Sequence, residues 1–162
     1  MGVADGLLER KVLSLGPRDA SGRRTIIDPD AGTPVGFCLR RPRGGWWPFL
    51  LRRIVAVHEL FDDSLLFTVR RCWSLFSWYE VRDADDQVVG WHGGPLLIDR
   101  RGHRVAARED EQATATSWFV GPSGAPLARL AWQGEDVRLT WTDEVASEPF
   151  VKMLLLAAAL WW

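Results

Sequence analysis

Hydrophobic and polar residues alternate along short runs of this chain, most clearly where Val137, Leu139 and Trp141 are separated by Arg138 and Thr140. Alternation with period two is typical of strands that bury one face. Clusters of Gly, Pro and Asp divide the runs at intervals of about eight to twelve residues, as in all-β domains. The pattern predicts about twelve strands, near residues 10–15, 24–28, 34–41, 52–60, 65–72, 77–83, 87–92, 95–99, 104–109, 115–121, 126–133 and 136–142.

A repeated pattern marks the turns between these runs, in the form D-x-x-G followed by an apolar residue three positions later. Asp99, Gly102 and Val105 match it fully. Asp accepts hydrogen bonds from nearby backbone N–H groups and Gly adopts positive φ, so this pattern is typical of tight hairpins. Near matches occur at 28–35, 83–89 and 121–127. The repeat therefore indicates strands that are joined as successive hairpins.

The segment SEPFVKMLLLAAALWW follows a different pattern, with only apolar and aromatic side chains from Met153 to Trp162. A helix that is apolar on every side must be enclosed by protein or by lipid. From Pro149 onward such a helix spans about 21 Å, less than the roughly 30 Å of a bilayer core. Pro149 suits the first helical turn and Ser147 suits the N-cap. The pattern favours a helix over about 148–162, buried inside the domain, with a membrane tail anchor as the alternative.

The length of 162 residues fits a single domain, 1–162. The net charge of −1 argues against a nucleic-acid partner, because general nucleic-acid binders carry a clear basic excess. Cys38 and Cys72 are too few for a disulfide framework. The first fifteen residues include acidic positions and no apolar stretch long enough for a secretory signal, so we expect a cytoplasmic protein.

The succession of twelve strands, D-x-x-G turns and an apolar helix resembles the tubby C-terminal-like fold, in the branch of phospholipid scramblases and LURP-one-related proteins. The stretch YEVRDADDQVVG is similar to a hairpin of that family, and EPFVKMLLLAAALWW is similar to its final helix. The resemblance implies a mainly β protein with a closed, largely antiparallel barrel of about twelve strands around the C-terminal helix. The segment DEVASE is too short for the calcium-associated region of scramblases, so we expect no calcium site.

An arginine-rich and tryptophan-rich segment, RRPRGGWWPFLLRR, is the candidate binding site for lipid or another anion. Arginines attract anionic head groups, and Trp rings suit the lipid interface. The candidate residues are Arg40, Arg41, Arg43, Trp46, Trp47, Arg52 and Arg53. The alternative is structural, with the aromatic residues covering one open end of the barrel and the arginines solvating it.

Two further basic pairs, Arg70–Arg71 and Arg100–Arg101, would join that site if all three lay at the same end of the barrel. The acidic clusters are explained by turn chemistry, and neither the histidines nor the cysteines have catalytic or metal-ligand spacing, so we expect no metal, no cofactor and no enzyme. The sequence thus predicts a non-enzymatic, lipid-associated module at a membrane surface. The alternative function is a soluble protein-interaction domain that uses the 40–53 loop.

Overall fold

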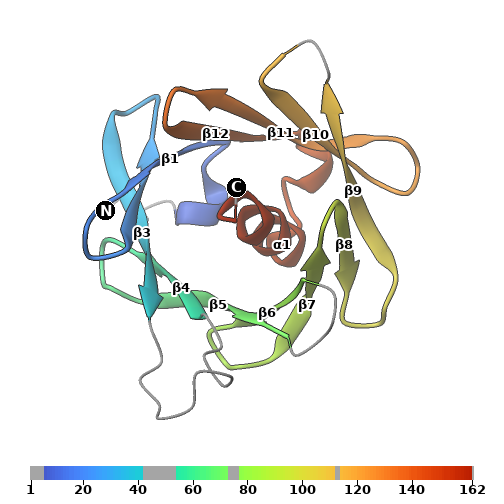
Figure 1. Cartoon of the computed structure of the whole chain (residues 1–162), viewed down its shortest axis with the longest axis horizontal. Helices are drawn as coiled ribbons and strands as arrows, with labels where there is room; N and C mark the ends of the chain where they lie inside the picture. Colours follow the sequence, from blue (N-terminus) through green and yellow to red (C-terminus); the bar gives the residue numbers. More distant parts are fainter. Residues whose placement is uncertain (1–5, 42–53, 73–76, 112–113, 162) are drawn as a thin grey trace.

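The computed structural model describes residues 6–41, 54–72, 77–111 and 114–161. Within these ranges, twelve antiparallel strands close into a barrel in which strands adjacent in sequence are paired and β1 pairs with β12. Figure 1 looks down the barrel and shows helix α1 inside it. The predicted mainly β class, the closed barrel and the enclosed C-terminal helix are confirmed.

The strands follow the predicted order closely. Their bounds are β1 (Val12–Arg18), β2 (Arg23–Asp28), β3 (Thr33–Arg41), β4 (Ile54–Glu59), β5 (Leu65–Arg71), β6 (Trp78–Asp83), β7 (Val88–Gly93), β8 (Leu96–Asp99), β9 (Arg104–Glu111), β10 (Thr116–Val120), β11 (Pro126–Gln133) and β12 (Asp136–Trp141). Two short 3₁₀ helices, η1 (Leu7–Glu9) and η3 (Asp143–Val145), flank the barrel in sequence, and α1 covers Pro149–Ala159.

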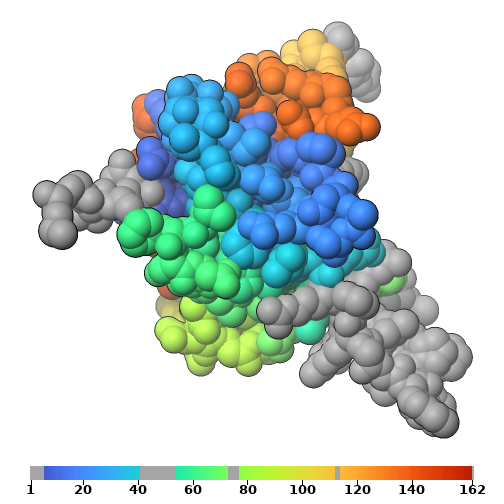
Figure 2. Space-filling view, turned by 90° about the vertical axis from the view of Figure 1, so that its left-hand side faces the viewer, coloured from blue at the N-terminus to red at the C-terminus, as the bar shows by residue number. Residues whose placement is uncertain are grey.

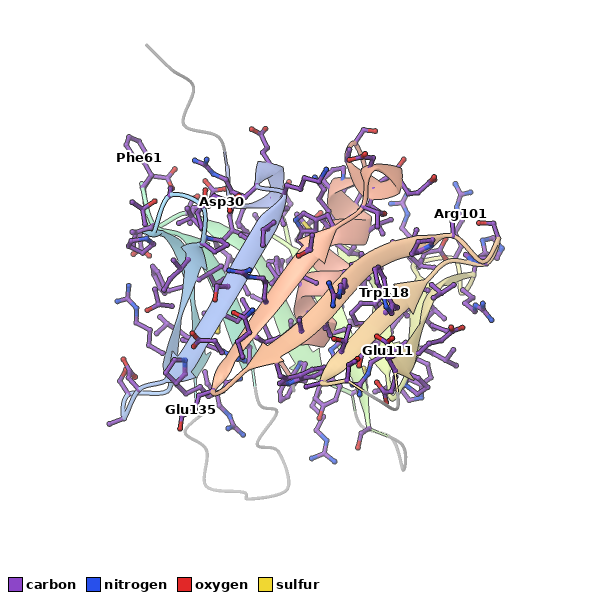
Figure 3. The ribbon with its side chains drawn as sticks, turned by 90° about the horizontal axis from the view of Figure 1, so that it is seen from above. Asp30, Phe61, Arg101, Glu111, Trp118 and Glu135 are labelled. Carbon is purple, nitrogen blue, oxygen red and sulfur yellow. The ribbon has the colours of Figure 1, made fainter. Side chains whose placement is uncertain are left out.

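Successive connections alternate between the two ends of the barrel. The upper end, as drawn in Figure 3, holds the β2–β3, β4–β5, β6–β7 and β8–β9 turns and the start of α1. The lower end holds the β1–β2 and β11–β12 turns and the last residues of β3, β5 and α1. Phe61 and Arg101 therefore lie at the upper end, whereas Glu135 lies at the lower end (Figure 3).

Helix α1 is the core of the barrel. Leu154, Leu155 and Leu156 are at most 1% exposed, and the alanines that follow them are equally enclosed. Inward-facing strand residues such as Phe67 and Phe119 pack around the helix. Side chains of the first strands form a continuous wall in the space-filling view of Figure 2. The apolar helix is thus enclosed by protein, as its pattern and length predicted.

Lys152, the one charged residue within α1, is also buried. Its Nζ donates hydrogen bonds to the backbone carbonyls of Leu8 and Ala146, each at 2.8 Å. Burial lowers the pKa of the Lys152 ammonium, because the charged form loses hydration. Lys152 therefore joins the start of α1 to the segments that precede β1 and follow β12.

The limits of α1 differ from the prediction. Glu148 rather than Ser147 is the N-cap residue, and it makes no side-chain capping bond. The helix ends at Ala159 rather than near 162, and the Leu160 carbonyl accepts a hydrogen bond from Arg18 Nη2 at 3.0 Å. A partner on the barrel wall therefore satisfies a carbonyl at the helix end, where no further helical turn is available to do so.

Asp side chains organise the hairpin turns in the predicted way. Asp99 Oδ1 accepts backbone hydrogen bonds from Arg101 and His103, and Gly102 takes φ +83°. The same arrangement occurs at Asp19, with Gly22 at φ +81°, although the repeat did not predict that turn. Recurrent Asp residues are therefore a property of the turns.

Candidate functional site

Arginines line the inner wall of the barrel at its lower end. Residues that pair directly across two strands project from the same face of the sheet. Arg40 pairs with the fully buried Val55, and Arg71 pairs with Tyr79, which stacks on the helix end. The same register argument places Arg18 and Arg24 on this face, since they pair with each other and Arg24 is buried. We call this group the arginine arc: Arg18, Arg24, Arg40 and Arg71.

Arg24 is the buried member of the arginine arc, with 4% of its surface exposed. Its Nε donates to the Gly16 carbonyl at 2.5 Å and its Nη2 donates to the Leu15 carbonyl at 3.2 Å. Burial, and next the neighbouring charge of Arg18, lower the pKa of the Arg24 guanidinium. An arginine stays protonated even so, and Arg24 is therefore a fixed positive charge inside the wall.

Arg18 and Arg71 are the exposed members of the arginine arc. Arg18 also caps α1 through the Leu160 carbonyl, where the negative end of the helix dipole favours a cation. Cys38 lies opposite Arg24 on β3, and burial raises the pKa of its thiol although both Arg18 and Arg24 act in the other direction. The thiol is accordingly protonated near neutral pH, so it does not neutralise the arginines.

A cluster of stacked rings lies at the lower end of the barrel, next to Arg71 of the arginine arc. Tyr79 stacks on His92 with ring centroids 4.9 Å apart and on Trp161 at 4.2 Å. Burial lowers the pKa of His92 to about 3, so the imidazole is neutral at physiological pH. His92 Nε2 and Trp161 Nε1 are buried without a hydrogen-bond partner among the described residues. This side of the lower end is therefore uncharged.

The described acids at the lower end include a partner of the arginine arc. Asp136 on β12 interacts electrostatically with Arg24. Asp110 on β9 accepts hydrogen bonds from Arg108 at 2.7 Å and from Ser117, and the bond from Arg108 is the main cause that lowers the pKa of its carboxyl. The other described acids at this end are Asp19, Glu109, Glu111 and Glu135.

The upper end of the barrel carries an excess of acids. Acidic residues of the described turns and flanking segments outnumber the basic ones there. The acids are Glu9, Asp28, Asp30, Glu59, Asp62, Asp63, Asp83, Asp85, Asp86, Asp99, Asp143, Glu144 and Glu148, against Arg10, Lys11, Arg82, Arg100, Arg101, Arg104 and Lys152. The net charge of −1 therefore conceals an uneven distribution of charge along the barrel axis.

The structure divides the predicted basic residues between the two ends. Arg40 and Arg41 complete β3 at the lower end, whereas Arg43, Trp46, Trp47, Arg52 and Arg53 lie outside the described residues. Arg71 shares the lower end with Arg40, but Arg100 and Arg101 follow β8 at the upper end. Arg70 is ion-paired with Asp86 at 2.8 Å. Among the described residues, Arg40, Arg41 and Arg71 therefore lie at the opposite end of the barrel from Arg100 and Arg101.

Arg18 and Arg24 are the members of the arginine arc that sequence reasoning missed. They lie far from Arg40 and Arg71 in the chain, and pairing of β1, β2 and β3 brings them alongside. A signal did exist, since Arg24 precedes the inward-facing Ile26 by two residues and so occupies an inward position.

A guanidinium cluster of this kind can bind phosphate or carboxylate through several N–H donors. Among the described residues, no three His, Cys, Asp or Glu side chains come together to hold a metal ion. No helix in the described ranges is long and apolar enough to cross a membrane.

Comparison with known proteins supports the architecture. No protein-family model matches the chain, and no curated protein matches it. A crystal structure of a protein from Arabidopsis thaliana is similar over 92% of this chain and 93% of that chain, with a TM-score of 0.57 and 12% identity. At 12% sequence identity the structural similarity shows a shared fold and nothing more. The two chains share this fold over nearly their whole lengths.

Proposed function

We propose that this protein is a non-enzymatic module that binds anionic lipid at a membrane surface through the lower end of its barrel. The observation that carries the proposal is the arginine arc, which faces away from the acidic upper end. Each basic residue near an anionic bilayer contributes about 1 kcal/mol of attraction. The excess of acids at the upper end would also orient the molecule with that end away from an anionic bilayer and its arginine arc toward it.

The fold adds support from a second direction. A closed barrel around an apolar helix fits the tubby-like architecture of phospholipid scramblases and LURP-one-related proteins, which the sequence resembles. The 40–53 segment connects β3 to β4. The last residue of β3 and the first residue of β4 both lie at the lower end of the barrel. We therefore place the protein in the cytoplasm, with peripheral attachment to the membrane through this end.

Vesicle co-sedimentation tests the proposal. The protein should sediment with vesicles that contain phosphatidylserine and remain in solution with pure phosphatidylcholine. Binding should weaken as salt rises, because exposed charges are screened over about 10 Å at 0.1 M salt. A protein that ignores phosphatidylserine vesicles at low salt would show the proposal to be wrong.

The competing function is a protein-interaction domain that uses the 40–53 loop. A partner captured through that loop and retained in detergent, together with no binding to anionic vesicles, would favour it. Vesicle binding that persists with purified protein alone would favour the lipid proposal.

A further inference from the structure

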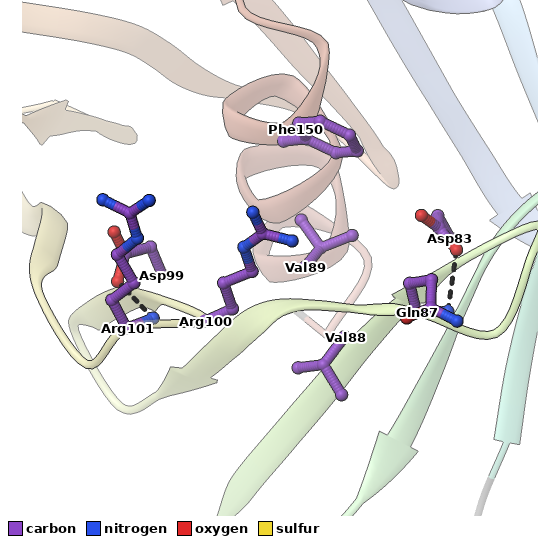
Figure 4. Close-up of a pocket in the computed structure, with 8 residues that line it drawn as sticks. All are labelled: Asp83, Gln87, Val88, Val89, Asp99, Arg100, Arg101 and Phe150. Carbon is purple, nitrogen blue, oxygen red and sulfur yellow. Dashed lines mark hydrogen bonds between the residues drawn. The ribbon is translucent and has the colours of Figure 1, made fainter.

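A separate cavity of about 260 Å³ lies at the upper end of the barrel, opposite the arginine arc. The β6–β7 turn, the β8–β9 turn and the first turn of α1 enclose it, as Figure 4 shows. None of its lining residues belongs to the lipid-binding end described above. They are Asp83, Gln87, Val88, Val89, Asp99, Arg100, Arg101 and Phe150.

One part of this cavity is apolar. Val89 of β7 points toward Phe150 and is 7% exposed, whereas Val88 projects from the other side of the strand (Figure 4). Phe150, in the first turn of α1, is 56% exposed, although it follows Pro149 at the very start of the enclosed helix. A large aromatic side chain that is left half in water beside Val89 offers apolar surface for a ligand to cover.

The other part of the cavity is cationic. Arg100 and Arg101 follow β8, and in Figure 4 the guanidinium of Arg100 is drawn between Arg101 and Val89. Among the described residues, the Arg100 guanidinium has neither a hydrogen bond nor an ion pair, and that of Arg101 has only an electrostatic interaction with Asp99. Both guanidiniums can therefore donate to an anionic ligand.

The two carboxylates of the cavity are already used by their own turns. Asp99 Oδ1 accepts the backbone N–H groups of Arg101 and His103, and backbone bonding from His103 is the first cause that lowers the pKa of its carboxyl. Asp83 Oδ1 likewise accepts backbone N–H groups, from Asp85 and Gln87. These acids stabilise the hairpins through backbone hydrogen bonds, whereas the side-chain N–H groups of Arg100 and Arg101 make no hydrogen bond among the described residues.

We propose that this cavity binds an amphipathic organic anion, with a carboxylate or phosphate head on Arg100 and Arg101 and a short apolar chain against Val89 and Phe150. The volume limits the chain. A water molecule takes about 30 Å³ in the liquid, so the cavity holds about nine groups of that size. Hexanoate has roughly eight non-hydrogen atoms, each about as large with its hydrogens as one water molecule. Its size therefore matches the cavity.

Titration followed by amide NMR on the full chain tests the proposal. Hexanoate and hexyl phosphate should give saturable shifts at Val88, Val89 and Arg100, and the tighter of the two identifies the preferred head group. Acetate, which lacks the chain, and hexylamine, which reverses the charge, should bind at least tenfold more weakly. Absence of saturable shifts with both anions, or equal binding of hexylamine, would overturn the proposal.

Matched variants separate the two parts of the cavity. Arg100→Gln should weaken hexanoate binding about tenfold or more, because bonds between charged groups are lost. Arg104→Gln removes an exposed arginine from the same hairpin and should leave binding unchanged, since Arg104 does not line the cavity. Phe150→Ala should also weaken binding, whereas Phe61→Ala, at another turn of the upper end, should not. Equal effects within either pair would contradict the assigned site.

Discussion

Removing the exposed charges of the arginine arc is the sharpest test of the proposed lipid function. Arg18 and Arg71 are exposed at the lower end, whereas Arg24 is buried and its replacement would disturb the fold. Glutamine at position 18 keeps a donor for the Leu160 carbonyl. At about 1 kcal/mol for each charge, the double variant Arg18→Gln/Arg71→Gln should lose about 2 kcal/mol of membrane affinity, or about 30-fold in the partition coefficient at low salt.

The assay is partitioning onto phosphatidylserine vesicles over a range of lipid concentrations, with thermal unfolding measured in parallel. The double variant Lys11→Gln/Arg104→Gln is the matched control, because it removes the same charge from exposed positions of the upper end that do not line the cavity. It should bind vesicles within about twofold of the original protein if the arginine arc faces the bilayer. An equal loss in both double variants would show that total charge, and no particular end of the barrel, governs the interaction.

Three further predictions concern the fold. Lys152→Ala removes the donor shared by the partly buried carbonyls of Leu8 and Ala146 and should cost about 2 kcal/mol in urea unfolding, whereas Lys11→Ala, which breaks an exposed ion pair, should cost less than about 0.5. Because the folded-state pKa of His92 is about 3 and the unfolded value about 6.5, unfolded protein binds more protons between them. The contribution of His92 to stability is thus complete above about pH 6.5 and falls by about 1.4 kcal/mol for each pH unit from there to about pH 3, a slope that His92→Phe should flatten; an unchanged slope would contradict the assignment. Leu155→Asp should abolish the folded circular dichroism spectrum, because its carboxylate would be buried without a partner; a variant that stayed folded would refute the enclosed helix.

The strands and the helix were predictable because each depends on local patterns. Apolar and polar residues alternate around Leu139 because one face of the barrel wall points inward and the other points to solvent. Every predicted strand is present. The enclosed helix followed from the absence of any polar face. The N-cap was not predictable in this way, because Ser147 has the right chemistry but the chain enters the helix one residue later.

The candidate site was only partly predictable, because charge position depends on pairing between strands. Arg40 was identified from a dense basic segment, but Arg18 is a single basic residue and Arg24 belongs only to the pair that it forms with Arg23. Nothing local distinguishes the end of the barrel that carries Arg71 from the end that carries Arg100. Only the alternation of the hairpins assigns them, and that alternation also separates the arginine arc from the acidic upper end.

Pairing of the first strand with the last has a consequence for how the protein folds during synthesis. Val12 lies opposite Thr140, so the barrel cannot close until β12 has left the ribosome. Helix α1 follows the last strand, so the strands are synthesised before the helix that fills the interior of the barrel. Closure over so great a sequence separation is intrinsically slow. The nascent strands would expose their apolar faces throughout this interval, which makes the unfinished barrel a natural client for chaperones that shield hydrophobic surface.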